Sequence, residues 1–249
     1  MAQQQFFAVC GIGRSGTSLV AQMLHSVGVG FGNPDAMSYS DASGSGWEHE
    51  IPNRIDCELL GHKYDPSWLN QTDGNIIWEY NFRKHYLESR AKDWIENEFQ
   101  DIPYVGWKSL RTSFTVPFWD IVTNNSVKYI ICFRSPAEVA QSNRIWGLSE
   151  EMLDTQKNYR LWFSFISAAI TNSGRQNRFL VHYNTLMQEP DKVLLGLSKF
   201  IDNANSIETM RACIDNSKQH HFNSDLHSVP TETANLYLCV KELFSEQFI

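Results

Sequence analysis

The chain has 249 residues, of which 42% are hydrophobic and 20% are charged, and its formal net charge is -7. This composition is typical of a globular protein with a sizeable core. The negative charge argues against general attraction to nucleic acids or anionic membranes. An anionic ligand must therefore be held by a local cluster of Arg, Lys and backbone N–H groups.

The five cysteines are dispersed and show no C-x-x-C spacing, which favours reduced thiols in a cytoplasmic protein. The first residues, MAQQQ, lack the basic region of a signal peptide, and no apolar run approaches ~18 residues, so we expect neither secretion nor a membrane span. Because no repeat, linker or low-complexity tract interrupts the sequence, we expect residues 1–249 to form a single domain.

The first part of the chain is predicted to form a strand, a glycine loop and a helix. Phe6–Cys10 is a short apolar run before glycines, which predicts a buried strand. From Thr17 the apolar residues follow helical spacing until Gly28 and Gly30, which are expected to end the helix. Residues 30–46 are rich in Gly, Ser, Asp and Asn and are expected to form one long loop.

Helices and strands alternate along the rest of the chain. The predicted helices are His49–Gly61, Tyr80–Phe99, Pro136 to about Trp146, and Glu150–Thr171, and the predicted strands are Tyr104–Lys108, Lys128–Phe133 and Phe179–Tyr183. Further helices fill most of the C-terminal part, and Ser135 is expected to cap the helix that begins at Pro136. This alternation predicts an α/β fold, a three-layer α/β/α arrangement with a mostly parallel central sheet, like that of P-loop NTPases.

The sequence GIGRSGTS, from Gly11 to Ser18, is nearly a phosphate-binding P-loop of the pattern G-x-x-x-x-G-K-[ST]. Gly11, Gly16 and Ser18 are in register, but Thr17 stands where the lysine belongs. A nucleotide-hydrolysing loop uses that lysine on the β- and γ-phosphates. A strand, a glycine loop and a helix nevertheless direct backbone N–H groups and a helix N-terminus at one point, which predicts an anion site.

A second candidate phosphate site follows the predicted strand Lys128–Phe133. Arg134 ends that strand, and Ser142 lies eight residues on, about two turns into the next helix. If both side chains face the same side of the helix start, they can bind a second phosphate. Alternatively, Arg134 pairs with a nearby carboxylate and Ser142 lies on the helix surface.

Together, the two features resemble the sulfotransferases that use 3′-phosphoadenosine 5′-phosphosulfate (PAPS). In that family the loop pattern [KR]-S-G-T-[ST], here Arg14–Ser18, holds the 5′-phosphosulfate, and its cation precedes the glycine. An Arg followed eight residues later by a Ser, here Arg134 and Ser142, holds the 3′-phosphate. The resemblance implies PAPS as donor and 3′-phosphoadenosine 5′-phosphate (PAP) as product. Because the transferred SO3 group carries less charge than a γ-phosphoryl group, we expect no metal ion.

Three further segments are similar to the family but depart from its pattern. Asn33-Pro34 and Gly46–Ile51 resemble the stretch N-P-x-G-[YF]-[WF]-E-x-x-x-I, with a longer gap between the halves. Trp107–Arg111 reads W-K-S-L-R where the family has W-K-D-P-R, and Tyr183–Leu186 reads Y-N-T-L where the family has Y-E-D-L.

The resemblance implies roles for individual residues. The expected nucleotide-binding residues are Gly13, Arg14, Ser15, Gly16, Thr17, Ser18, Arg134, Ser142 and, against the adenine, Tyr183. Arg14 is expected to stabilise charge on the leaving 5′-phosphate. Glu48 is the expected base for the acceptor hydroxyl, with Glu50 and His49 as alternatives. The expected acceptor-side residues are Trp47, Glu50, Lys108 and Arg111. Surface ion pairs of Lys108 and Arg111 and a core role for Tyr183 are the alternative interpretations.

The sequence therefore favours a PAPS-dependent sulfotransferase acting on a hydroxyl of a small-molecule, carbohydrate or lipid acceptor. A P-loop nucleotide kinase or ATPase is the second hypothesis, although the lysine of its loop is absent. A nucleotide-binding module without catalysis is the third, because the W-K-S-L-R and Y-N-T-L segments are altered.

Overall fold

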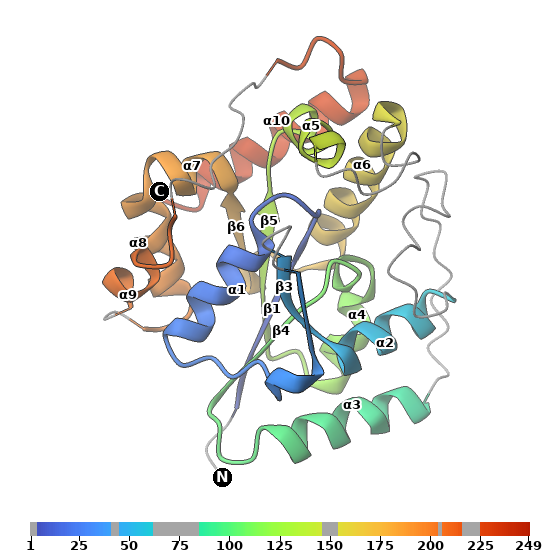
Figure 1. Cartoon of the computed structure of the whole chain (residues 1–249), viewed down its shortest axis with the longest axis vertical. Helices are drawn as coiled ribbons and strands as arrows, with labels where there is room; N and C mark the ends of the chain where they lie inside the picture. The colour runs from blue at the N-terminus through green and yellow to red at the C-terminus, as the bar shows by residue number, and fades with distance from the viewer. Residues whose placement is uncertain (1–3, 41–44, 62–84, 146–153, 204–205, 216–224) are drawn as a thin grey trace.

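The computed structural model describes residues 4–40, 45–61, 85–145, 154–203, 206–215 and 225–249 (Figure 1). Within these residues, the central sheet has parallel strands in the order β4-β1-β5-β6. The strands are β1 (Gln5–Gly11), β4 (Tyr104–Lys108), β5 (Val127–Phe133) and β6 (Arg178–His182). Their nearly continuous apolar sequences fit a parallel sheet that is covered on both faces.

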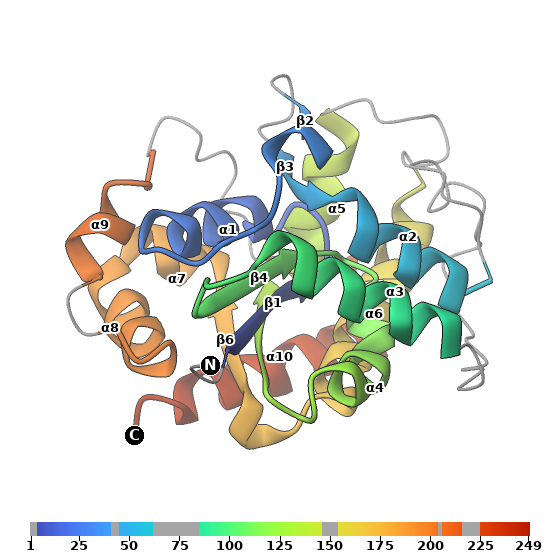
Figure 2. The same ribbon diagram turned by 90° about the horizontal axis from the view of Figure 1, so that it is seen from below.

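Helices cover both faces of this sheet (Figure 2), which confirms the predicted three-layer α/β/α fold. On one side lie α1 (Thr17–Ser26), α8 (Pro190–Phe200) and α9 (Ile207–Arg211). On the other lie α4 (Thr112–Val122), α6 (Thr155–Asn172) and α10 (Thr231–Glu246). The remaining helices are α2 (Glu50–Leu59), α3 (His85–Glu98), α5 (Pro136–Ile145) and α7 (Tyr183–Gln188), with 3-10 turns at Pro34–Ala36 and Arg175–Asn177.

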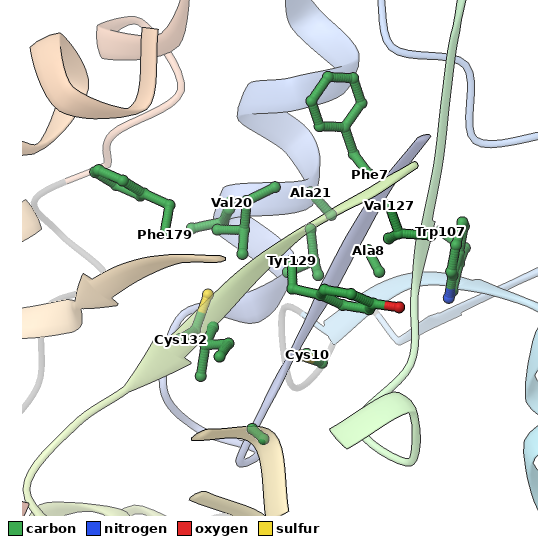
Figure 3. Packing of buried hydrophobic residues seen from close by; sticks show 14 of the residues in the cluster. Phe7, Ala8, Cys10, Val20, Ala21, Trp107, Val127, Tyr129, Cys132 and Phe179 are labelled. Carbon is green, nitrogen blue, oxygen red and sulfur yellow. The ribbon is translucent and has the colours of Figure 1, made fainter. Parts of the chain in front are cut away.

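The larger hydrophobic cluster joins the α1 layer to the sheet (Figure 3). Val20 and Ala21 of α1 are fully buried, and Tyr129 on the sheet is 1% exposed. The two strand cysteines, Cys10 and Cys132, are also fully buried, and burial raises the pKa of Cys10 to about 12. Both thiols are therefore structural. In the described part of the chain, no helix is long and apolar enough to cross a membrane.

The prediction of one long loop over residues 30–46 is wrong. After the turn Pro34–Ala36, an antiparallel pair forms from β2 (Met37–Ser40) and β3 (Ser45–His49), and residues 41–44 between them lie outside the described ranges. The segment was missed because its many Gly and Ser residues hide the apolar alternation that identifies a strand. The pair contains a bulge, because two residues, Gly46 and Trp47, stand opposite the single residue Tyr39.

Other element boundaries agree with the sequence within a few residues. The predicted helix start at Tyr80 and the predicted helix end at Trp146 lie outside the described residues. The helix predicted from Glu150 begins later, at Thr155, because Asp154 is extended and caps it by accepting from the N–H groups of Gln156 and Lys157. β6 ends at His182, so Tyr183 begins α7 rather than closing the strand. Ser135 precedes α5 as expected, but its buried hydroxyl makes no hydrogen bond within the described residues and does not cap the helix.

Candidate functional site

The candidate site lies where the loops after β1 and β5 meet. These two strands are neighbours and parallel, so residues 12–16 and 134–135 leave the sheet at the same edge. From β1 the chain turns to α1 on one face, whereas the helices that follow β4 and β5 pack on the other face. The carboxyl ends of strands at such a switch in winding direction are where α/β proteins bind ligands.

The loop after β1 has the features of an anion site. Arg14 and Gly16 adopt left-handed backbone conformations, with φ values of 65° and 82°, and α1 begins immediately afterwards. The first turn of α1 has neither a side-chain cap nor an acidic residue. Ser15 is fully buried, and its hydroxyl finds no hydrogen-bond partner within the described residues. A helix N-terminus beside a buried hydroxyl that lacks an acceptor suits a phosphate group.

The two predicted phosphate sites come together in space. Arg14 Nε donates a hydrogen bond of 3.1 Å to Ser142 Oγ, across 128 residues of sequence. The pKa of Arg14 is lowered, chiefly by burial and next by the charge of Arg134, so the two guanidinium groups are close enough to repel each other. The structure thus brings Arg14, Arg134 and Ser142 to one place.

Arg134 is held on several sides. It is 4% exposed, and its Nε donates to Glu138 Oε2 at 2.7 Å, which is the carboxylate pairing that the sequence left open. Its guanidinium carbon lies 4.8 Å from the centre of the Tyr183 ring. The Trp162 indole donates to the Arg134 carbonyl at 2.9 Å. Arg134 is therefore a fixed cation at the edge of the sheet.

Tyr183 lies between the two loops. Its half-buried ring stacks on Arg134 and also lies against Gly16, where an added Cβ would come within 2.6 Å of Tyr183 Cδ2. Burial raises the pKa of Tyr183, with Arg134 and Arg14 acting in the opposite direction. A residue larger than glycine at position 16 would displace this ring.

Glu48 and Lys108 form the other half of the site. Lys108, at the end of β4, is 2% exposed, and its Nζ donates to Glu48 Oε1 at 2.7 Å and to the Gly46 carbonyl at 3.0 Å. The Gly46 N–H in turn donates to Ser18 Oγ at 3.2 Å. The hairpin, the loop after β1 and the end of β4 are thereby joined, and in this ion pair Lys108 is buried whereas the Glu48 side chain is partly exposed.

The two alternative bases have other partners. His49 caps α2, because its Nδ1 accepts the Ile51 N–H at 3.2 Å, and its Nε2 lies 3.0 Å from Glu98 Oε2. Burial lowers the pKa of His49, with Glu98 opposing. Glu50 forms an exposed ion pair with Arg54. Of the three candidates, Glu48 is the one that reaches Lys108.

The remaining predicted residues lie around this centre. Trp47 has a left-handed backbone, with φ of 68°, and its ring packs 4.7 Å from His25 and 5.6 Å from Phe31. Arg111 is 7% exposed, and its Nη1 lies 3.4 Å from Asn53 Oδ1. Among the loop residues, Gly13 lies next to Leu110, and Thr17 is 5% exposed.

Sequence reasoning missed three buried polar residues beside the site: Asp56, Glu138 and Asn184. Asp56 is fully buried on α2, on the same face as Ile55 and Leu59, and a carboxylate within an apolar face is the signal that identifies it. Glu138 lies one helical turn after Arg134, a spacing at which opposite charges pair. No local pattern links Asn184 to Glu138.

No family model matches the chain, and no curated protein matches its sequence. Its structure is similar to the sulfotransferase domain of the Synechococcus PCC 7002 olefin synthase, with a TM-score of 0.55, 14% identity, and coverage of 96% of this chain and 95% of that domain. The sulfotransferase domain from the curacin biosynthetic pathway gives a TM-score of 0.52 at 15% identity, with coverage of 96% and 98%. Sulfotransferase STF9 from Mycobacterium avium gives 0.50 at 13% identity, with coverage of 99% and 76%. The chain therefore has the fold of these bacterial sulfotransferases.

Proposed function

We propose that this protein is a PAPS-dependent sulfotransferase that sulfates a hydroxyl of a small-molecule, carbohydrate or lipid acceptor. The observation that carries the proposal is the meeting of Arg14, Arg134 and Ser142, from two loops, at the switch point of the sheet. In a chain of net charge -7, two neighbouring guanidinium groups at a helix N-terminus indicate a local site for an anionic ligand.

The residues present fit a nucleotide with separate 5′ and 3′ phosphates. The buried Ser15 hydroxyl and the N-terminus of α1 provide donors at the loop after β1, and Arg134 with Ser142 provides them at the loop after β5. When bound, PAPS supplies the sulfuryl group. Arg14, which stays charged and offers several donors, would stabilise the negative charge that grows on the 5′-phosphate.

Glu48 and Lys108 would act on the acceptor. As the acceptor oxygen bonds to sulfur, the proton of its hydroxyl passes to the Glu48 carboxylate. Lys108 fixes that carboxylate through the 2.7 Å ion pair. The two groups contribute by position and charge, which are the main sources of catalysis in transfers of this type.

The test is calorimetric titration with PAP in the absence of metal, with ATP and Mg²⁺ as the comparison. We expect the wild-type protein to bind PAP, and Arg134→Ala to weaken binding by roughly tenfold to a hundredfold, because a charge-assisted bond contributes about 1.5–3 kcal/mol. Arg144→Ala, which removes an exposed cation from α5, the helix that follows Arg134, is the matched control and should leave PAP affinity unchanged.

Each other outcome points to one of the alternative functions. Absence of PAP binding overturns the proposal, and binding of ATP with Mg²⁺ in its place favours a kinase or ATPase. PAP binding without sulfate transfer from PAPS to any hydroxyl acceptor favours a nucleotide-binding module without catalysis.

A further inference from the structure

We propose that Glu138 and Asn184 are positioning residues that hold Arg134 in the orientation needed to bind a 3′-phosphate. The inference rests on the proposed function and deepens it. Neither residue touches the ligand in this scheme, and both act through the guanidinium of Arg134.

The Glu138 carboxylate is fully buried and is bonded on both oxygens. Arg134 Nε donates to Oε2 at 2.7 Å, and the Asn184 amide donates to Oε1 at 3.0 Å and to Oε2 at 2.9 Å. A buried charge is costly unless it is paired and hydrogen-bonded, so the carboxylate has little freedom to move. Since Nε donates to Glu138, we infer that a phosphate would be bound through the terminal NH2 groups of Arg134, which can donate in a bidentate manner.

The start of α7 supports Arg134 from a second direction. Tyr183 and Asn184 are consecutive residues, and the Tyr183 ring lies 4.8 Å from the guanidinium carbon while Asn184 binds Glu138. The same ring lies against Gly16 of the other phosphate loop. The start of α7 therefore holds the Arg134 guanidinium in two ways. Tyr183 covers the flat face of the guanidinium, and Asn184 supports the Glu138 carboxylate that binds Nε. Because Tyr183 also contacts Gly16, these contacts place Arg134 relative to the loop after β1.

The residue type at position 184 matters because of Glu138. In this chain the amide donates to the carboxylate, whereas an aspartate with the same side-chain position would place a second negative charge about 3 Å from the first. That charge would attract the Arg134 guanidinium and compete with a phosphate for it. The neutral Asn of the Y-N-T-L segment can thus donate to the acidic residue on α5 without adding a negative charge.

The experiment compares PAP with 5′-AMP, which lacks the 3′-phosphate, by calorimetry at pH 8. The wild-type protein should bind PAP more tightly than AMP. Asn184→Asp should reduce the ratio of PAP affinity to AMP affinity by about tenfold or more, with AMP affinity nearly unchanged. Asn184→Ala, which removes the donor without adding charge, is the matched control and should reduce the ratio less. A residue needed only for folding would lower both affinities together.

A pH series separates charge from packing. In Asn184→Asp, one of the two adjacent carboxyl groups should take up a proton as the pH falls, so the affinity ratio relative to wild type should recover towards pH 5. The ionisable groups around them are Arg134, Arg14, Tyr183, Tyr237 and His182. Burial lowers the pKa of His182 to about 4, so its imidazole is mostly neutral at pH 5. Asn184→Ala should show no such recovery.

Glu138→Asp provides a second variant, because it keeps the charge but withdraws it by one methylene from Arg134. It should lower the affinity ratio in the same way. An unchanged ratio in a folded Asn184→Asp or Glu138→Asp protein overturns the positioning role. Equal affinity of the wild-type protein for PAP and AMP would instead overturn the 3′-phosphate site itself, and with it the proposed function.

Discussion

Removal of the Asp56 carboxylate should destabilise the protein strongly. Asp56 accepts hydrogen bonds from the hydroxyls of Ser109 (2.7 Å), Thr112 (2.9 Å) and Thr115 (2.6 Å) and from the Trp119 indole (2.9 Å). In Asp56→Ala the indole N–H cannot turn to another acceptor, which costs about 1–3 kcal/mol, and each hydroxyl loses a charged acceptor worth about 1 kcal/mol. We therefore expect a loss of about 4–6 kcal/mol in the free energy of unfolding, or roughly 8–24 °C in melting temperature.

Urea unfolding of three proteins measures this effect. Asp56→Asn keeps an acceptor oxygen for the indole and lets two hydroxyls turn to accept from its amide, so it should lose only about 1 kcal/mol. Burial raises the pKa of Asp56, with the four donors opposing, so its carboxyl contributes most to stability at low pH and loses that contribution as the pH rises. The stability of wild type relative to Asp56→Asn should therefore improve from pH 8 to pH 5. An Asp56→Ala protein within 1 kcal/mol of wild type would refute the four-bond network as a source of stability.

Three further changes test the site. Glu48→Gln should leave PAP affinity within about twofold of wild type and reduce sulfate transfer by about a hundredfold, measured with labelled PAPS, and retained transfer would reassign the base to Glu50 or His49. Gly16→Ala should lower the free energy of unfolding in urea by about 3 kcal/mol, because φ is 82° and the Tyr183 ring must move. The same change should weaken PAP binding, and unchanged PAP affinity would contradict the contact between Tyr183 and Gly16. At Trp47, where φ is 68°, the Trp47→Gly protein should be more stable than the Trp47→Ala protein by about 1 kcal/mol, which is the reverse of the usual order in a strand. If Trp47→Ala is the more stable variant, the left-handed backbone is not retained.

Much of the fold could be predicted because its signals are local. The apolar runs at β1, β4 and β5 and the helical spacing after Thr17 are properties of neighbouring residues. The order of strand, glycine loop and helix after β1 is also local, and the anion site that this order favours stays a prediction. The bond from Arg14 to Ser142 brings the two loops together, whereas the binding of a second phosphate by Arg134 and Ser142 stays a prediction.

The contacts between distant residues could not be predicted. Lys108 and Glu48 are separated by 60 residues, and Asn184 and Glu138 by 46, so no periodicity relates them. The β2–β3 pair was missed because its polar, glycine-rich sequence is typical of loops, and tertiary contacts stabilise it instead.

The hydrogen bonds of Gly46 have a consequence for engineering. Its N–H donates to Ser18 at the end of the loop after β1, and its carbonyl accepts from Lys108 on the central sheet. Under the proposed function, a designer who wishes to alter acceptor preference would exchange the β2–β3 hairpin as a unit. Such an exchange would remove one contact of the loop after β1, so the proposed donor and acceptor specificities would not be independent. A successful exchange would preserve the bulge at positions 46 and 47 and vary the hairpin beyond it.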